Sequence, residues 1–136
     1  MQRNAILDTI EIDDEMEGFI RENFALSDFT DRIRLHIGDA LKIIDKWEDN
    51  LFDLVFMDGD KRLYIDFLKD VLPKVRAGGF IIVDNTLWDG HVVESGKHSS
   101  QTKGIIEFND YVLCQDCLEV AIIPVRDGLT ILRKIK

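Results

Sequence analysis

Acidic and amide side chains recur at the ends of predicted strands, which is where an open α/β sheet binds its ligands. Asp58 follows the apolar run Phe52–Met57, and Asp84 and Asn85 follow the run Phe80–Val83. Two carboxylates and an amide oxygen at neighbouring strand ends suit a hard divalent cation that keeps several waters or substrate oxygens. The pattern predicts a Mg²⁺ site, with Mn²⁺ or Ca²⁺ as substitutes. The alternative is that Asp84 and Asn85 are ordinary turn residues.

Two further charged residues have chemistry to offer beside such a cation. Lys61 lies three residues after Asp58 and would act as a general base if the metal lowered its pKa; otherwise it is a surface lysine on the first turn of a helix. Glu11 ends an early predicted strand, where a carboxylate can bind both hydroxyls of a ribose. A Glu before a helix also complements the helix dipole, so Glu11 alone is weak evidence for a nucleoside site.

Alternating strands and helices would position these residues. Apolar periodicity predicts strands at 5–12, 33–37, 52–57, 80–83, 118–123 and 129–135, and helices at 19–24, 41–47, 64–72 and 105–113. A long polar loop is expected between Thr86 and Thr102. This order predicts an α/β fold with an open, doubly wound, mostly parallel sheet that has helices on both faces and closes with an antiparallel hairpin.

The composition is that of an ordinary globular chain. Its 136 residues are 46% hydrophobic and 32% charged, which suits a single domain over 1–136. A net charge of −9 argues against free DNA as a partner. No apolar run is long enough to cross a membrane, and no signal-peptide core follows Met1–Arg3, so we expect a cytoplasmic protein without a membrane partner. Cys114 and Cys117 lack the second pair that a zinc site needs.

Several motifs resemble those of the cation-dependent O-methyltransferases, the family that contains catechol and caffeoyl-CoA methyltransferases. The segment 52–64, FDLVFMDGDKRLY, resembles that family's FDLVFxDxDKxxY, and AGGFIIVDNTLWDG at 77–90 resembles its GGxxxxDNxLWxG. Shorter likenesses are TIEID at 9–13 to the ribose-binding strand end, GDA at 38–40 to the adenine-contacting turn, and PVRDGLT at 124–130 to the closing PxxDGLT. The likeness covers almost the whole chain.

The resemblance implies a Rossmann-like methyltransferase fold that uses S-adenosylmethionine. In this chemistry the metal binds two vicinal oxygens of the acceptor, lowers the pKa of one hydroxyl and directs the oxyanion at the sulfonium methyl group. The implied roles are metal ligands at Asp58, Asp84 and Asn85; catalysis by Lys61 and Asp58; cofactor contacts at Glu11, Asp39, Ala40 and Asp58; and an acceptor contact at Trp88. The expected acceptor is a hydroxylated small molecule, a coenzyme A ester or a modified tRNA base.

The chain departs from the family at its start. Family members begin with helices and a strand that ends in a glycine-rich turn, whereas the stretch before Thr9 contains no glycine. We therefore interpret the chain as the C-terminal part of such an enzyme, without its first strand. The strands ending at Glu11 and Met57 would then pair directly, leave a gap or accept a strand from another copy, and a homodimer is expected.

Two alternatives come from other functional classes. A two-component receiver domain also has paired acids after its first strand, a phosphoacceptor Asp after its third and a Thr after its fourth, as Asp13-Asp14, Asp58 and Thr86 would provide. A receiver, however, has a Lys before the proline that follows its fifth strand, where this chain has Ile123. The other alternative is a non-catalytic remnant that serves as an interaction module.

Overall fold

The computed structural model describes residues 5–136, and its internal contacts divide the chain into two compact units, Met1–Lys46 and Trp47–Lys136. We call these the N-terminal unit and the C-terminal unit. Residues 1–4, which include the start that we judged to lack a signal-peptide core, lie outside the described residues. Within residues 5–136, no helix has both the length and the apolar character that a bilayer crossing requires.

The N-terminal unit is built on a two-stranded parallel sheet. Its elements are β1 (Leu7–Glu11), the 3-10 turn η1 (Asp14–Met16), α1 (Glu17–Ala25), η2 (Thr30–Arg32), β2 (Ile33–Ile37) and α2 (Ala40–Ile44). The two strands pair in register from Leu7 with Ile33 to Glu11 with Ile37, so both end at the same edge. The helix predicted at 41–47 is shorter in the structure, where it ends at Ile44. Trp47 lies beyond its end, and its ring packs edge-on against Phe52.

The C-terminal unit contains a four-stranded mixed sheet. Its elements are β3 (Phe52–Met57), η3 (Lys61–Leu63), α3 (Tyr64–Lys74), β4 (Val75–Asp84), η4 (Trp88–Val93), α4 (Ser100–Leu113), β5 (Leu118–Ile123) and β6 (Leu129–Lys134). The strand order is β3-β4-β6-β5. β3 and β4 run parallel, and β6 is antiparallel to both β4 and β5, so the predicted closing hairpin is confirmed.

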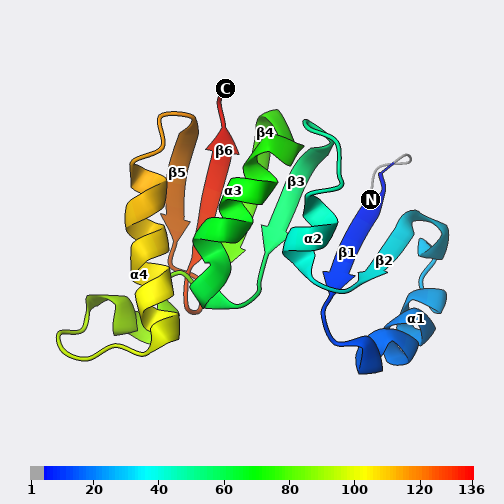
Figure 1. Ribbon diagram of the computed structural model, residues 1–136, viewed down its shortest axis with the longest axis horizontal. Coiled ribbons are helices and arrows are strands. Elements are labelled where there is room, and N and C mark those ends of the chain that lie inside the picture. The colour runs from blue at the N-terminus through cyan, green and yellow to red at the C-terminus, as the bar shows by residue number, and fades with distance from the viewer. Residues whose placement is uncertain (1–4) are drawn as a thin grey trace. The chain divides into compact units, whose positions relative to one another are not determined.

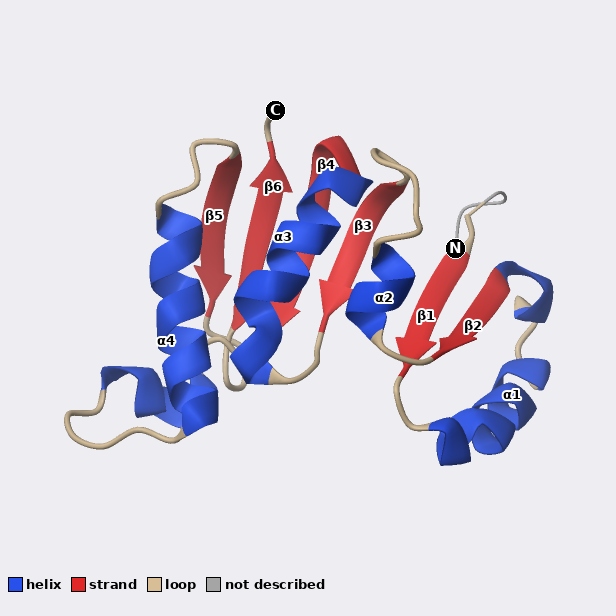
Figure 2. Cartoon of the chain, viewed as in Figure 1, coloured by secondary structure: helices blue, strands red, loops and turns tan. Residues whose placement is uncertain are grey.

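The core of the C-terminal unit lies between its sheet and the two long helices. Figures 1 and 2 show α3 and α4 side by side on one face of the sheet. Alternate strand residues reach into this layer, and Ile81, Val83 and Leu132 are fully buried. From the helices, Tyr64 and Phe108 meet with ring centroids 5.5 Å apart in an edge-to-face arrangement, and both are fully buried. This packing holds the ends of β3 and β4 rigidly.

The opposite face of this sheet carries large apolar side chains that solvent reaches. Leu54 and Phe56 on β3 are 55% and 59% exposed, Phe80 on β4 is 41% exposed and Ile123 on β5 is 40% exposed. The register places these residues on the face opposite Ile81, because Leu54 pairs with Phe80. We call this surface the open face. The expectation of helices on both faces is therefore not met within the described part of this unit.

The structure corrects the expected sheet. β1 pairs with β2 and β3 pairs with β4, so the described strands form two sheets and not the one sheet that we predicted. Among the described residues, two of the four strand pairings are parallel, so the sheet is mixed rather than mostly parallel. Periodicity reports which segments are strands but carries no information on which distant strands pair. The α/β class itself is confirmed.

Several element boundaries also differ from the prediction, most of all those of β4 and α4. β4 begins at Val75 and not at the predicted residue 80, so the glycines at 78 and 79 lie inside the strand. The expected long loop from Thr86 to Thr102 contains η4 and the first residues of α4, which starts at Ser100. The Ser99 side chain accepts a hydrogen bond from the N–H of Thr102, and such an N-cap adds a turn that apolar periodicity alone does not indicate.

Candidate active site

Lys61 is buried and paired with a carboxylate at the end of β3. Asp58 directly follows β3, and a short turn leads into η3, where Lys61 is the first residue. Only 7% of Lys61 is exposed, and its Nζ donates a hydrogen bond of 2.7 Å to Asp58 Oδ1. The ammonium also lies 5.0 Å from the ring centre of Tyr64 and 6.0 Å from that of Trp88. Lys61 is therefore not an exposed surface lysine, which was the alternative considered from the sequence.

The pKa of Lys61 reflects two opposing influences. Burial of the ammonium works to lower the pKa, but the hydrogen bonds and charges of Asp58 and Tyr64 outweigh it, so the pKa lies above its ordinary value. Desolvation also raises the pKa of the Tyr64 phenol. In this arrangement Lys61 holds its proton.

Helix α4 supports the main chain of Lys61. The Lys61 N–H donates to Gln101 Oε1 at 3.0 Å. Gly104, one turn further along α4, permits the close approach, since a Cβ atom there would lie 2.5 Å from the Lys61 carbonyl oxygen. Sequence reasoning missed both residues. The Lys61 motif contains no sign of them, because they lie 40 or more positions later in the chain.

Asp84 lies beside the Asp58 end of the sheet. The β3–β4 register pairs Met57 with Val83, so Asp58 and Asp84 each occupy the position after a paired residue. Neighbouring strands are about 4.8 Å apart, which supports the prediction that these two carboxylates share one edge. The Tyr64 hydroxyl donates to the Asp84 carbonyl oxygen at 3.0 Å, and this bond ties the Lys61 side of the site to β4.

The chain after β4 is held by a buried polar network. Thr86 and Thr130 are fully buried, and the Thr130 hydroxyl donates to the Thr86 hydroxyl at 2.8 Å. From α4, Asn109 Nδ2 donates to the Thr86 carbonyl oxygen at 2.9 Å. Asn85 adopts a left-handed conformation with φ of 59°, which Asn tolerates better than most residues, and its N–H donates to Asp84 Oδ1 at 2.8 Å.

Two polar cavities adjoin these residues. The first, of about 600 Å³, is lined by Asp84, Asn85, Asp89, Arg126 and Asp127. The second, of about 330 Å³, is lined by Trp88, His91, Glu94, Lys97, His98, Ser99 and Thr102. Asp84 and Asn85, two of the three predicted metal ligands, thus share one cavity. The predicted acceptor contact Trp88 lines the other cavity, and its ring also faces the Lys61 ammonium.

The candidate metal ligands are oxygen donors of the kind that Mg²⁺ binds. Within the described residues, no three or more His, Cys, Asp or Glu side chains form a group that could hold a metal. The candidate ligands are two carboxylates and one Asn amide oxygen, and a group that includes Asn is not of this kind. Convergence of the oxygens of Asp58, Asp84 and Asn85 on one cation stays a prediction.

The predicted cofactor contacts of the N-terminal unit share one edge of its sheet. Glu11 is the last residue of β1, and its carbonyl oxygen accepts a 2.8 Å hydrogen bond from the N–H of Gly38, beside Asp39. The Glu11 side chain accepts from the Asp13 N–H at 2.9 Å, and Asp39 Oδ1 accepts from the Leu41 N–H at 3.1 Å. Ala40 begins α2. Their role in cofactor binding stays a prediction.

Solved methyltransferase structures share this fold. A methyltransferase from Podospora anserina, PaMTH1, solved with SAH, matches 97% of this chain with a TM-score of 0.85 and 26% identity, and this chain covers 62% of it. TomG from Streptomyces achromogenes, an O-methyltransferase solved with SAM, matches 100% of this chain with a TM-score of 0.89. At 22% identity, with 65% of TomG covered, this second likeness shows the fold alone.

The sequence comparisons define the family. A family model described as O-methyltransferase matches residues 3–135, and the chain belongs to this family. A caffeoyl-CoA O-methyltransferase from Eucalyptus gunnii is 32% identical over 134 residues, which are 85% of this chain and 53% of that protein. Caffeoyl-CoA O-methyltransferase 2 from Zea mays is 36% identical over 116 residues, 80% of this chain and 43% of that protein. The chain thus spans about half the length of these relatives. The receiver alternative is wrong.

Proposed function

We propose that this chain contributes to S-adenosylmethionine-dependent, divalent-metal-assisted methylation of a hydroxyl group. The observation that carries the proposal is the buried Lys61, which donates a hydrogen bond to Asp58. Asp58 and Asp84 each lie one position beyond a pair of residues in the register of β3 and β4. Burying a lysine ammonium beside strand-end carboxylates costs solvation free energy, and the packing of the fold does not require a lysine there. Membership of the O-methyltransferase family supports this chemistry.

The donor set fits a hard cation. Asp58 and Asp84 would supply carboxylate oxygens and Asn85 an amide oxygen, leaving room for the acceptor and water. When bound there, a Mg²⁺, Mn²⁺ or Ca²⁺ ion would hold the acceptor oxygens and lower the pKa of the reacting hydroxyl. One oxygen of Asp84 already accepts from a main-chain N–H, and a carboxylate retains further lone pairs for a cation.

Lys61 would receive the proton of the acceptor hydroxyl at Nζ. S-adenosylmethionine, held by Glu11, Asp39, Ala40 and Asp58, would supply the methyl group to the acceptor oxygen and would be left as a neutral thioether. Lys61 must be neutral for this step, and its pKa is raised chiefly by the Asp58 carboxylate and Tyr64 against the effect of burial. Engagement of Asp58 by the cation would remove that restraint, so burial would then favour the neutral amine.

Cofactor and acceptor would be bound by the remaining predicted residues. We propose that Glu11, Asp39 and Ala40 contact the nucleoside part of the cofactor and that Asp58 approaches its methionine end. Trp88, which lines the smaller cavity, would contact the acceptor. The acceptor class is a hydroxylated small molecule, a coenzyme A ester or a modified base.

The proposed setting is a cytoplasmic homodimer of single-domain chains. Two surfaces support self-association: β3 is an edge strand of its sheet, and the open face carries exposed Leu54, Phe56 and Phe80. Analytical ultracentrifugation tests this part of the proposal, and a monomer at all accessible concentrations would remove it.

Transfer of a labelled methyl group from S-adenosylmethionine tests the proposal. With a catechol-type acceptor and Mg²⁺, turnover should disappear on chelation with EDTA and return with added Mg²⁺. Lys61→Ala should lower turnover roughly 10²- to 10⁴-fold, as expected for removal of a positioned base, with nearly unchanged cofactor affinity by calorimetry. Arg62→Ala, which removes the exposed neighbouring cation, is the matched control and should retain near-parental turnover.

The outcomes separate the alternatives. If the chain binds the cofactor but transfers no methyl group to any of a panel of hydroxylated acceptors, the proposed acceptor class is wrong. Absence of cofactor binding in calorimetry would favour the interaction-module alternative for this chain. Full activity of Lys61→Ala would show that the metal alone activates the acceptor.

A further inference from the structure

The turn that precedes β6 is locked against the chain that follows β4. The N–H of Thr86 donates to the Gly128 carbonyl oxygen at 3.1 Å, and the N–H of Leu87 donates to the Asp127 carbonyl oxygen at 2.7 Å. Gly128 has φ of 93°, and a Cβ atom there would lie 2.5 Å from Leu87 Cγ, so only glycine permits this approach. The main-chain positions beside the candidate cation site are therefore fixed.

The Asp127 side chain makes a separate contact with a candidate metal ligand. Asn85 Nδ2 donates a hydrogen bond of 2.8 Å to Asp127 Oδ2, across 42 positions of sequence. An ionised carboxylate can only accept hydrogen bonds, so the NH₂ group of the Asn85 amide must face Asp127. The amide is planar, and its Oδ1 is consequently turned away from Asp127 and remains available as an acceptor.

We propose that Asp127 is a positioning residue that holds the Asn85 amide with Oδ1 presented to the divalent cation; this inference rests on the proposed function. An asparagine amide presents either oxygen or NH₂ when its outer torsion turns by half a rotation, and NH₂ repels a cation. Residues that orient metal ligands in this way typically change metal affinity 10- to 100-fold when they are lost. Asp127 thus selects the orientation of Asn85 that can bind the cation.

A direct role of the Asp127 charge is the competing explanation. The same cavity is lined by Asp84, Asp89 and Arg126, so Asp127 also contributes to its charge. The two roles are separable, because an asparagine at 127 keeps an acceptor oxygen for Asn85 but removes the negative charge. Substitution of Asn85 itself is less informative, since its left-handed backbone favours few side chains.

Mn²⁺ binding to the 136-residue chain, followed by electron paramagnetic resonance and calorimetry without cofactor or acceptor, tests the inference. Asp127→Ala should weaken Mn²⁺ binding about 10- to 100-fold, while Asp127→Asn should stay within about threefold of the parent. Asp89→Asn is the matched control, because it removes one charge from the same cavity and leaves the Asn85–Asp127 bond intact. Thermal unfolding by circular dichroism should show that all three variants fold.

Each outcome bears on a different statement. Equal losses in Asp127→Asn and Asp127→Ala, or parental affinity in Asp127→Ala, would overturn the positioning role while leaving the metal site in place. No Mn²⁺ binding by the parent chain would overturn the proposed cation and this inference together. A selective loss in Asp127→Ala, accompanied by a change in the chemical shifts of the Asn85 side-chain NH₂ group in NMR spectra, supports the inference.

Discussion

The two units differ in how they hold their candidate site residues. In the C-terminal unit, Lys61 is buried, its ammonium faces the fully buried ring of Tyr64, and Tyr64 packs against the fully buried ring of Phe108. Among the described residues of the N-terminal unit, Ile44 is the one buried hydrophobic side chain, and Phe19 and Leu26 on or next to α1 are 63% and 86% exposed. The proposed proton-transfer and metal residues therefore belong to a packed structure, whereas the proposed nucleoside contacts lie on elements with little core.

This difference teaches which part of the reaction the chain can organise by itself. Dense packing fixes side chains in single rotamers, which a positioned base and a metal ligand need. Elements with few buried apolar contacts open at low free energy, so ligand binding is expected to order them. We expect Glu11 and Asp39 to gain rigidity from the cofactor, whereas Lys61 and Asp84 have it beforehand.

The largest effect should come from removing a core ring. Phe108→Ala is expected to lower the free energy of unfolding by about 3–5 kcal/mol, because the ring is fully buried and leaves a cavity. Phe19→Ala, the matched change in the N-terminal unit, should stay within about 0.5 kcal/mol. Urea unfolding followed by circular dichroism measures both, and equal losses would break the contrast between the units.

A buried hydroxyl pair should give an intermediate effect. Thr130→Val removes the donor to Thr86 and leaves a buried hydroxyl without this partner, at an expected cost of about 1–3 kcal/mol. Thr9→Val on the half-buried β1 is the control and should be nearly neutral. The double variant Thr86→Val with Thr130→Val should recover part of the loss, and additive losses in the double variant would contradict this account.

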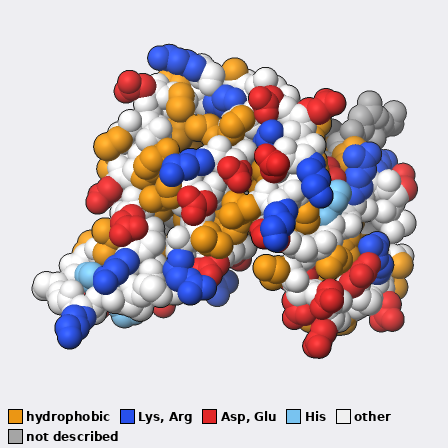
Figure 3. All heavy atoms as spheres, viewed as in Figure 1, with side chains coloured by type: hydrophobic (Ala, Val, Ile, Leu, Met, Phe, Trp, Pro, Cys, Tyr) orange, Lys and Arg blue, Asp and Glu red, His pale blue; other side chains and the backbone are white. Residues whose placement is uncertain are grey.

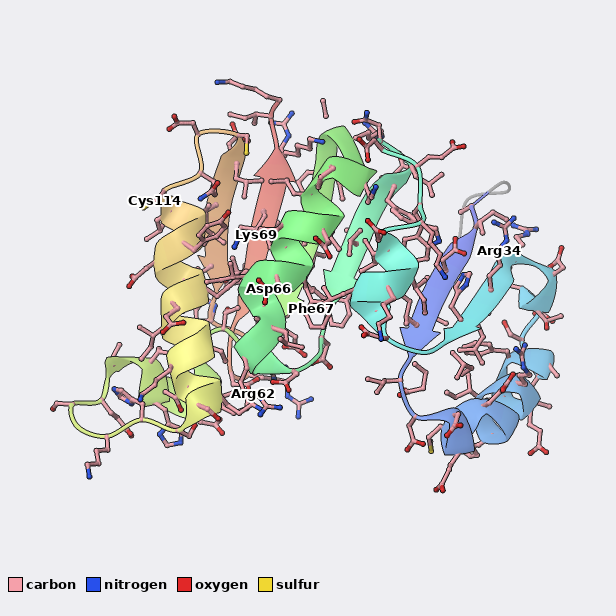
Figure 4. All side chains as sticks on the ribbon, viewed as in Figure 1. Arg34, Arg62, Asp66, Phe67, Lys69 and Cys114 are labelled. Carbon is pink, nitrogen blue, oxygen red and sulfur yellow. The ribbon has the colours of Figure 1, made fainter. Side chains whose placement is uncertain are left out.

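The smallest effect on stability should come from surface ion pairs. Both units have such pairs, so these pairs should not account for the difference between the units. Arg62, labelled in Figure 4, lies in η3 just before α3 and donates to Asp60 at 2.9 Å and 3.0 Å. This hydrogen bonding lowers the pKa of Asp60 from 3.8 to about 2. A lowered carboxyl pKa stabilises the fold above about pH 4, and that contribution disappears as the pH falls towards 2. Both groups are accessible to solvent, so screening keeps the contribution small.

NMR titration of the Asp60 carboxyl measures this effect. In Arg62→Gln the pKa of Asp60 should return towards 3.8 while the urea midpoint at pH 7 barely moves. Arg21→Gln, which removes the 2.7 Å bond between Arg21 and Glu17 on α1, is the corresponding change in the N-terminal unit. A large loss of stability in either variant would mean that surface pairs, not burial, distinguish the units.

Much of the fold could be predicted because its signals are local. The strands at 33–37, 52–57 and 118–123 have the predicted bounds, since continuous apolar runs end there at turn residues. Family motifs also gave the candidate residues of the site. The burial of Lys61 could not be predicted, because it depends on contact with α4 at Gly104.

The contact between Asn85 and Asp127 escaped prediction for the same reason. Both residues stand in motifs that we had recognised, but nothing in either motif states that they meet across the sheet. A clue was available in the closing PVRDGLT segment, to which we assigned a family likeness but no role for its Asp. The distribution of charged side chains over the surface could not be predicted from composition either. On the view drawn in Figure 3, basic side chains are scattered among acidic ones instead of forming one patch.

Self-association through the open face, if it forms the proposed homodimer, would depend on temperature. Contacts between apolar surfaces near 25 °C are driven by the entropy of water, so they strengthen on warming and weaken on cooling. Association through Leu54, Phe56, Phe80 and Ile123 would therefore increase between the cold room and body temperature. Sulfate would act in the same direction as heat, because excluded salts also favour burial of apolar surface.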